Sequence, residues 1–300
     1  MIGFNDFIRI GKIKNLSDRT IKYYECAFSY LTNHISEKTL CCSIDKETIY
    51  GFIEYLKKRN PNISPVTINT YVRGVRAIFY HLMELGYINK FKIELIQSTK
   101  KIKPTYTDDE LNILLKKPNV KTCSFKEYRN WVIVNYLLAT GNRARTVINV
   151  KICDIDFSSG LIKLSATKNK KQQLVPISNT LNIILTEYLK YRKGNPDEYL
   201  FCNMYGQQMT QDSLHNAILN YNRSRSITKT SIHLFRHTFA KKWILNGGDI
   251  FRLQKLLGHS SLDIVKEYVD MFSCDLMKDF NSFNPLESMN TNYRGNIIRM

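Results

Sequence analysis

The segment SIHLFRHTFAKKWILNGGDIFRLQKLLGHSSLDIVKEY concentrates side chains that can bind phosphate oxygens and move protons. His233, Arg236 and His237 stand close together, and His259 and Tyr268 follow in the same segment. Arginine offers phosphate a planar and permanently charged fork, and histidine exchanges protons near neutral pH. A tyrosine phenol can attack phosphorus without a metal-activated water. The segment therefore contains the side chains that transfer of a phosphodiester would require.

Such a transfer builds negative charge on the phosphate oxygens, and fixed cationic donors stabilise that charge in the transition state. If the phosphodiester belongs to a DNA strand, the 5′-oxygen that leaves must receive a proton from an acid. Because a phosphotyrosyl ester keeps the energy of the broken bond, strands can be rejoined without ATP, and we predict no cofactor. His233 and His237 have the spacing of a helical metal pair. The HExxH glutamate and a nearby cysteine pair are both missing, so we predict no metal site.

The composition favours a polyanionic partner. Lysine and arginine number 44 against 26 acidic residues, for a formal net charge of +18. The basic excess is present in both halves of the chain, so it is not confined to a tail. This distribution favours double-stranded DNA held along the whole molecule.

The sequence also predicts a soluble, cytoplasmic protein with no membrane association. The seven cysteines are an odd number without a repeated CxxC motif, which suits a reducing compartment better than a disulfide framework. Charges interrupt every short apolar run of the N-terminus, so it does not resemble a signal peptide. The longest apolar stretch, around WVIVNYLLA, is too short to span a bilayer.

Residues 1–96 are predicted to form a helical domain. In SPVTINTYVRGVRAIFYHLMELGY, apolar residues recur at helical spacing up to Gly86, at Ile68, Tyr71, Val72, Val75, Phe79 and Leu82. Arg73 and Arg76 share another face of this helix, where they either contact DNA phosphates or are simply solvated. An earlier helix is predicted with Ser17 or Asp18 as its N-cap.

The polar, basic segment QSTKKIKPTY, residues 97–106, is predicted to be an interdomain linker. A second domain over residues 107–275 begins with Thr107 as a helix N-cap followed by acidic residues. In its middle, two short β-rich runs flank a Lys/Asn turn, preceded by another strand. We therefore predict a mainly α (α+β) fold, with a small antiparallel sheet in a mostly helical second domain.

Four blocks resemble the tyrosine recombinase (phage integrase) family over roughly residues 105–275. In the family's order, they are ATGNRARTVINV, ATKNKKQQLVPI, HLFRHTFA and LLGHSSLDIVKEYV. The resemblance implies six catalytic residues: Arg143, Lys168, His233, Arg236, His259 and Tyr268. Residues 1–96 resemble the family's SAM-like core-binding DNA-binding domain in position and pattern.

The resemblance also implies a role for each residue. Tyr268 would attack the scissile phosphate to form a 3′-phosphotyrosyl bond, and Lys168 would protonate the leaving 5′-hydroxyl. The charged oxygens would be held by Arg143, Arg236, His233 and His259. We expect His237 to support the site, and Lys170 and Lys171 to be solvated or to touch DNA. Thr146 departs from the family, which usually has an acidic residue there, whereas Phe235 in place of leucine exchanges one core residue for another.

Local sequence accounts for several of these placements. Gly141 can end the NWVIVNYLLA helix in a left-handed turn, so that Arg143 opens the next helix facing away from the core. Gly258 can likewise end the FRLQKLL helix just before His259. Three leucines of that helix are predicted to pack inward: Leu253, Leu256 and Leu257.

Together these features predict a site-specific DNA recombinase for integration or excision of a mobile element or for Xer-like resolution. The resemblance implies a homotetramer acting on two DNA sites. Two alternatives stay open. A type IB topoisomerase uses similar groups but relaxes supercoils as a monomer without a defined site, and a catalytically idle DNA-binding regulator would keep only the fold.

The C-terminal tail, residues 276–300, contains an apolar stripe of Leu276, Phe280 and Phe283. The stripe needs a partner surface. It either folds back onto its own domain or, as the resemblance implies, docks on a neighbouring subunit.

Overall fold

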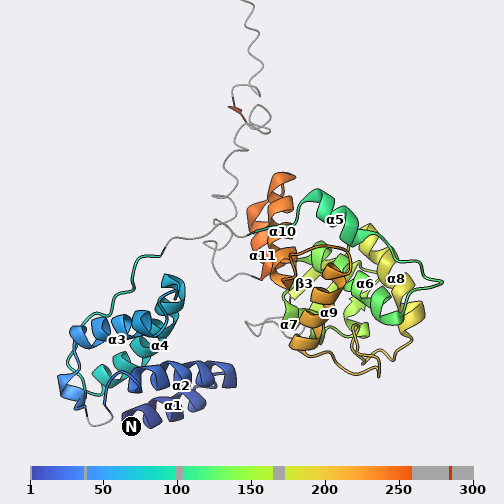
Figure 1. Cartoon of the computed structure of the whole chain (residues 1–300). Helices are drawn as coiled ribbons and strands as arrows, with labels where there is room; N and C mark the ends of the chain where they lie inside the picture. Colours follow the sequence, from blue (N-terminus) through green and yellow to red (C-terminus); the bar gives the residue numbers. More distant parts are fainter. Residues whose placement is uncertain (1, 37–38, 99–103, 165–172, 259–283, 286–300) are drawn as a thin grey trace, which may run out of the picture. The chain divides into compact units, whose positions relative to one another are not determined.

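The computed structural model describes residues 2–36, 39–98, 104–164, 173–258 and 284–285. The chain divides into two compact units, unit 1 (residues 1–101) and unit 2 (residues 102–300), shown in Figure 1. The described parts of both are mostly helical, with a small antiparallel sheet in unit 2. The predicted mainly α (α+β) fold class is thus confirmed.

The described part of unit 1 contains helices only. Its elements are α1 (Ile2–Ile13), α2 (Asp18–Thr32), the short 3-10 helix η1 (Cys41–Ser43), α3 (Lys46–Arg59) and α4 (Pro65–Glu84). Helix α4 contacts α1, α2 and α3, and is therefore the central helix of the unit. Of the two N-caps predicted for α2, Ser17 is the one used, with its hydroxyl accepting from the Thr20 N–H at 3.2 Å.

Helix α4 forms where its apolar periodicity predicts it. The Ser64 hydroxyl accepts from the Thr67 N–H at 3.1 Å, and Pro65 occupies the first turn, where its missing N–H costs nothing. The predicted stripe is buried apart from the half-buried Tyr71. The helix ends at Glu84, just before Gly86 turns left-handed with a φ of 76°. Apolar spacing and terminal residues together therefore account for this helix.

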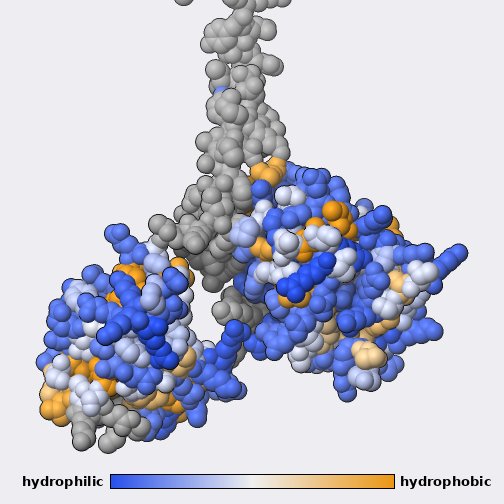
Figure 2. Space-filling model, viewed as in Figure 1, coloured by the Kyte–Doolittle hydropathy of each residue, from blue (hydrophilic) through white to orange (hydrophobic). Residues whose placement is uncertain are grey.

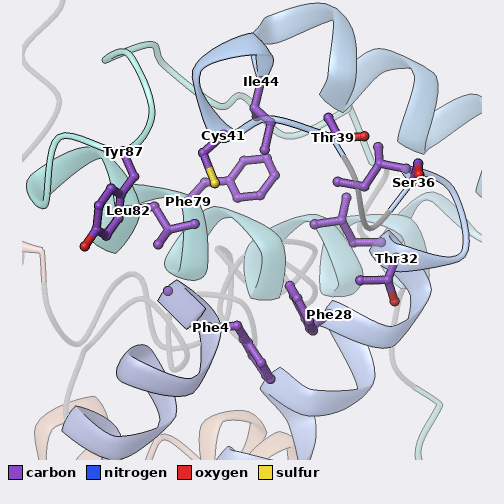
Figure 3. A pocket seen from close by; sticks show the side chains of 13 residues that line it. Phe4, Phe28, Thr32, Ser36, Thr39, Cys41, Ile44, Phe79, Leu82 and Tyr87 are labelled. Carbon is purple, nitrogen blue, oxygen red and sulfur yellow. The ribbon is translucent and has the colours of Figure 1, made fainter. Parts of the chain in front are cut away.

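An apolar cavity of about 500 Å³ opens between α1, α2, η1 and α4. Figure 3 shows Phe4, Phe28, Phe79 and Leu82 around it, with Thr32 among the few polar groups. None of the described residues predicted to act in catalysis lines this cavity.

Unit 2 surrounds a long buried helix with shorter ones. Its described elements are α5 (Asp108–Leu115), α6 (Phe125–Thr140), α7 (Ala144–Asn149), the 3-10 helix η2 (Ile152–Asp154), β1 (Ile155–Asp156), β2 (Leu161–Leu164), β3 (Gln173–Pro176), α8 (Asn179–Arg192), α9 (Gln211–Arg223), α10 (Ile232–Leu245) and α11 (Ile250–Leu257). The strands form an antiparallel sheet in the order β1-β2-β3. The predicted strands and their antiparallel pairing are confirmed.

Helix α6 is the centre of unit 2 and contacts α5, α8, α9 and α10. Val132, Ile133 and Val134 are consecutive and all fully buried, so apolar contacts surround this helix. It even buries Arg129, whose Nη1 donates to the carbonyl of Cys202 at 2.6 Å. An interior helix of this kind gives the surrounding helices a common surface on which to pack.

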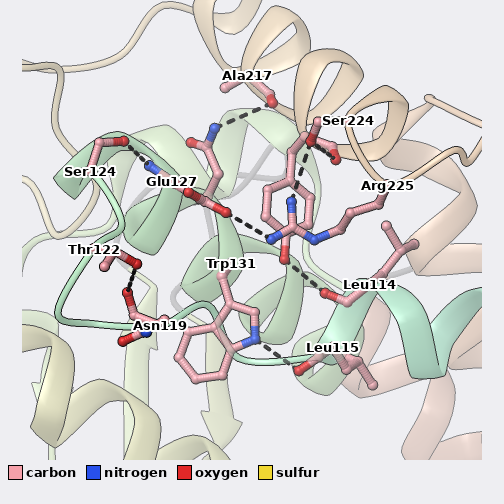
Figure 4. A network of polar contacts seen from close by, with 12 residues as sticks. Leu114, Leu115, Asn119, Thr122, Ser124, Glu127, Trp131, Ala217, Ser224 and Arg225 are labelled. Atoms are coloured by element: carbon pink, nitrogen blue, oxygen red, sulfur yellow. Dashed lines mark hydrogen bonds and ion pairs between the residues drawn. The ribbon is translucent and has the colours of Figure 1, made fainter.

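A polar network joins α5, α6 and α9 (Figure 4). Ser124 caps α6 by accepting from the Glu127 N–H at 3.1 Å, and the Glu127 carboxylate pairs with the Arg225 guanidinium at 3.1 Å. That guanidinium lies 3.8 Å from the centre of the Tyr221 ring. The Tyr221 hydroxyl in turn donates to the carbonyl of Leu114 at 2.8 Å. These contacts therefore connect α5, α6 and α9 through polar groups that bond to one another.

The first residues of unit 2 are fastened to α10 and to the segment before it. Thr107 caps α5 as predicted, in a capping box with Glu110. The Tyr106 N–H donates to Thr238 Oγ1 of α10 at 2.9 Å, and Lys229 pairs with Glu110 at 2.7 Å. The start of the unit thus rests directly against the helix that carries the HLFRH motif.

The visible surfaces of both units are mostly hydrophilic, with small hydrophobic patches (Figure 2). Among the described residues, none of the helices has the length and hydropathy that crossing a membrane requires.

Candidate active site

Helix α10 carries three of the predicted site residues. Leu234 and Phe235 point into the core, and the Phe235 ring packs 4.5 Å from that of Tyr106, measured between centroids. Phe235 thus serves as the core residue that was expected. His233 is exposed on the other side of the helix, whereas Arg236 is only 6% exposed. Burial of so polar a side chain requires hydrogen-bond partners.

Arg236 finds two of its partners at the ends of other helices. Its Nη1 donates to the carbonyl of Gly141 at 2.8 Å, at the end of α6. Its Nη2 donates to the carbonyl of Leu257 at 2.7 Å, at the end of α11. Carbonyls at helix C-termini lack intrahelical partners and carry partial negative charge, so they suit a guanidinium. Arg236 thereby ties α6, α10 and α11 together at one point.

Arg143 stands two residues beyond the first of these carbonyls. Gly141 ends α6 with a φ of 60°, and Arg143 becomes the N-cap residue of α7, as predicted. A Cβ on Gly141 would lie 2.6 Å from Phe239 Cδ1 and 2.9 Å from Leu257 Cδ2, so the site needs glycine for space as well as for conformation. The half-buried Arg143 is therefore held close to Arg236 by a rigid turn.

His233 lies one turn before Arg236 on α10, and the charges of Arg236 and Arg143 both act on its ring. Although His233 is exposed, the part of its ring that faces the protein loses hydration, which lowers its pKa below the usual 6.5, and the positive charges of Arg236 and Arg143 lower that pKa further. The imidazole is therefore mostly neutral at neutral pH. The structure thus brings three of the six predicted catalytic residues to one place.

The end of α11 and the start of β3 lie beside this cluster. Gly258 ends α11 in a left-handed turn, with a φ of 59°, as predicted from the sequence. Gln173, the first residue of β3, donates from Nε2 to the carbonyls of Lys255 and Leu256 in the last turn of α11. The start of β3 and the end of α11 are therefore in direct contact.

Five predicted site residues lie outside the described part of the chain: Lys168, Lys170, Lys171, His259 and Tyr268. Their described neighbours in sequence still locate the segments that lead to them. Leu164 pairs with Gln173 on either side of the predicted Lys/Asn turn, and Gly258 directly precedes His259. A Cβ on Gly258 would lie 2.8 Å from Gln173 Oε1, and the carbonyl of Leu257, just before Gly258, accepts from Arg236, so these two chain positions adjoin the arginine cluster.

The remaining predicted residues are found where the helices place them. His237 is half-buried on α10, one turn after His233. Arg73 is exposed and Arg76 half-buried on α4 of unit 1, and both are close enough to Tyr23 for their charges to favour its ionised form. Burial nevertheless outweighs them and raises the pKa of Tyr23.

Sequence reasoning missed Gln173 and Asn142. Asn142 is buried beside Arg143, and its Nδ2 donates to the Tyr136 hydroxyl at 3.0 Å, which braces the turn after α6. Its position between Gly141 and Arg143 in the TGNR motif is a local signal for such a role. For Gln173 the sequence offers no signal, because a glutamine in a short strand is ordinarily a solvated residue.

Comparison with known proteins identifies the family. Residues 105–273 match the phage integrase family, and residues 4–102 match the phage integrase SAM-like domain. The tyrosine recombinase XerD of Listeria innocua is 25% identical over 289 residues, covering 91% of this chain and 94% of that protein. XerD of Staphylococcus haemolyticus is 26% identical over 290 residues, covering 93% and 96%.

Solved structures of low identity share the fold. The XerH site-specific recombinase bound to palindromic difH substrate in a post-cleavage complex has a TM-score of 0.71 at 20% identity, covering 89% of this chain and 81% of that one. The Tn1549 transposon integrase in complex with a circular intermediate DNA has a TM-score of 0.71 at 19% identity, covering 87% and 93%. The family matches span nearly the whole chain, which therefore belongs to the phage integrase family and is a tyrosine-type site-specific DNA recombinase.

Proposed function

We propose that this recombinase cleaves double-stranded DNA through a 3′-phosphotyrosyl bond to Tyr268 and rejoins it by reversal of that step. The supporting observation is the convergence of Arg143, His233 and Arg236, fastened by the two bonds of Arg236 to helix ends. Two guanidinium groups and an imidazole in one place suit a phosphate whose oxygens gain charge in the transition state.

Each group has a distinct part in the proposed reaction. Arg143 and Arg236 keep their charge at any physiological pH and donate to the non-bridging oxygens. His233, neutral because its pKa is lowered, donates a hydrogen bond from one ring nitrogen without adding a third charge. Lys168 gives its proton to the leaving 5′-oxygen, and His259 joins the groups that hold the phosphate.

The proposed partner is double-stranded DNA, bound by both units. The structurally similar XerH, Tn1549 integrase and a lambda integrase dimer were all solved with DNA, the last with a TM-score of 0.69 at 15% identity. The net charge of +18 provides the cations for such binding. Arg73 and Arg76 of α4 would contact phosphates from unit 1, and the active assembly would be a homotetramer on two sites.

The same chemistry serves integration, excision and Xer-like resolution. The near full-length match to XerD proteins supports resolution as the task of this chain. A plasmid with two directly repeated target sites tests this. Resolution predicts two separate circles, whereas relaxation of supercoils in a plasmid without any site would instead indicate topoisomerase activity.

The decisive experiment uses a nicked suicide substrate carrying a target site selected from random duplex DNA. Wild type is expected to form a covalent adduct, and Tyr268→Phe is expected to bind the DNA without forming one. Tyr205→Phe is the matched control, because Tyr205 is 77% exposed and lies outside the four motif blocks. An adduct with Tyr268→Phe would place the nucleophile elsewhere, and no adduct with wild type would indicate an idle DNA-binding regulator.

The tail, residues 276–300, is proposed to dock on a neighbouring subunit. Its stripe of Leu276, Phe280 and Phe283 lies outside the described residues. A chain ending at Ser273 should bind a single site but lose recombination between two sites on one plasmid. Full recombination by this shortened chain would leave the tail as a cover for its own domain.

A further inference from the structure

The C-terminal end of α11 is saturated with hydrogen-bond donors. A helix leaves its last four carbonyls without intrahelical partners, and at a surface helix water usually satisfies them. In α11 all four accept from protein groups, namely the carbonyls of Gln254, Lys255, Leu256 and Leu257. The Gly258 N–H serves the first two, Gln173 serves the second and third, and Arg236 serves the fourth.

Gln173 reaches this helix end from a distant part of the chain. It is 82 residues from Lys255, to whose carbonyl its Nε2 donates at 3.1 Å. The other side of its carboxamide is also confined, because a Cβ on Gly258 would lie only 2.8 Å from Gln173 Oε1. The Gln173 side chain therefore links β3 to the last turn of α11 through its amide nitrogen, in a space that only a glycine at position 258 leaves open.

The contact between Gln173 and α11 fixes the carbonyl of Leu257, which orients Arg236. Helix α11 has only eight residues, so its last turn depends on tertiary contacts for order. Without Gln173, the carbonyls of Lys255 and Leu256 would turn to solvent and the turn would fray. The Leu257 carbonyl would move with it, and the Arg236 guanidinium would lose an acceptor that helps to set its plane.

We propose that Gln173 is a positioning residue for Arg236, acting through the last turn of α11. This inference rests on the proposed function of Arg236 as a phosphate-binding residue. Removal of Gln173 would shift the Arg236 guanidinium without removing a positive charge. It should therefore lower the rate of DNA cleavage far more than it weakens DNA binding.

The cleavage test compares Gln173→Ala and Gln173→Glu with Leu174→Ala. The glutamate keeps the size of the side chain but replaces its N–H donor with a second acceptor facing two carbonyls. Leu174 is the adjacent residue of β3 and is 57% exposed, so its variant controls for changes to the strand. Both Gln173 variants should slow single-turnover cleavage of the suicide substrate on the order of 100-fold at saturating protein. Leu174→Ala should cleave like wild type.

A packing role for Gln173 predicts a different pattern. Glutamate would then substitute for glutamine almost without loss, and this outcome would overturn the proposal. Losses of DNA affinity as large as the losses of rate would also overturn it, because they would indicate that Gln173 is needed for the DNA-binding surface as a whole.

A second measurement follows Arg236 without any cleavage. The imidazole of His233 senses the charge of Arg236, so its titration, measured by NMR on the free protein, reports where that guanidinium lies. In Gln173→Ala the pKa of His233 should rise toward its ordinary value, and in Leu174→Ala it should not change. An unchanged titration in Gln173→Ala would refute the link to Arg236. If wild type formed no DNA adduct, the proposed function would fail, while this titration would still decide whether Gln173 positions Arg236.

Discussion

Gly141 and Phe239 approach so closely that no side chain fits between them. A Cβ on Gly141 would lie 2.6 Å from Phe239 Cδ1, and the glycine has a φ of 60° that other residues adopt at a cost. The carbonyl of this same glycine accepts the Nη1 bond of Arg236 at 2.8 Å. Packing between the end of α6 and α10 therefore sets the position of the Gly141 carbonyl, which orients Arg236.

Gly141→Ala should destabilise the protein by about 2 to 4 kcal/mol, the sum of backbone strain and overpacking. Gly206→Ala is the matched control, since Gly206 has a φ of 78° in the same unit but no atom within 4 Å of its added Cβ. Gly206→Ala should lower the free energy of unfolding by only about 1 kcal/mol, from backbone strain alone. Chemical denaturation measures both values, and equal losses would show that the contact with Phe239 relaxes freely.

Arg143→Ala should reduce single-turnover cleavage by about two to three orders of magnitude, because a preorganised charged donor is lost in the transition state. Arg236→Ala should do the same. Arg145→Ala, on the exposed side of α7, removes the same charge without touching the cluster and should leave the rate nearly intact. DNA affinity, measured in parallel, should fall much less than the rate. If affinity and rate fell equally, Arg143 would be an ordinary phosphate contact.

The pKa of His233 should rise in Arg143→Ala, because one of the two positive charges that lower it is removed. Arg145→Ala should leave it unchanged. In wild type the folded state lowers this pKa, so below about pH 6.5 the unfolded chain binds more protons than the folded one. His233 should therefore reduce the free energy of unfolding as the pH falls through this range, and His233→Gln should remove that part of the pH dependence. NMR titration and denaturation at several pH values check the two statements.

DNA binding should weaken steeply with added salt, because phosphate contacts release counterions. The plot of log affinity against log salt concentration has a negative slope. If Arg73 and Arg76 touch phosphates, replacing either with alanine should make this slope less steep by about one. Arg9 of α1 is the control, since it is already paired with Asp6 at 2.7 Å. Slopes that match the Arg9→Ala slope would mean that the two α4 arginines are only solvated.

Local chemistry explains which parts of the structure the sequence predicted well. Ser17, Thr107, Gly141 and Gly258 each act at the helix end where their residue type is favoured, and such ends depend on a few adjacent residues. Apolar periodicity was equally informative for α4. In α11 the same reasoning was right for Leu253 and Leu257 but less so for Leu256, which lies on the flank of the helix and is half-buried.

The contacts that assemble the site were beyond reach of the sequence because they join distant segments. Arg236 meets the carbonyl of Gly141 across 95 residues, and Gln173 meets α11 across more than 80. The motif identified Arg236 as a phosphate-binding residue, but not that two helix ends hold it. No local pattern encodes a bond to a backbone carbonyl, since every residue has one.

The fastening of the first residues of unit 2 has a mechanical consequence. Tyr106 donates its N–H to Thr238 and packs its ring against that of Phe235, and Asp108 pairs with Lys242, so three contacts in succession end on α10. Just before these contacts, the carbonyl of Thr105 accepts from Lys229 Nζ at 2.9 Å, in the segment that leads into α10. A tensile load that reaches unit 2 through the chain from unit 1 would therefore act on α10 and on the segment before it, ahead of the buried α6. The helix that holds His233 and Arg236 is thus among the first elements of unit 2 to bear a load that arrives along the chain.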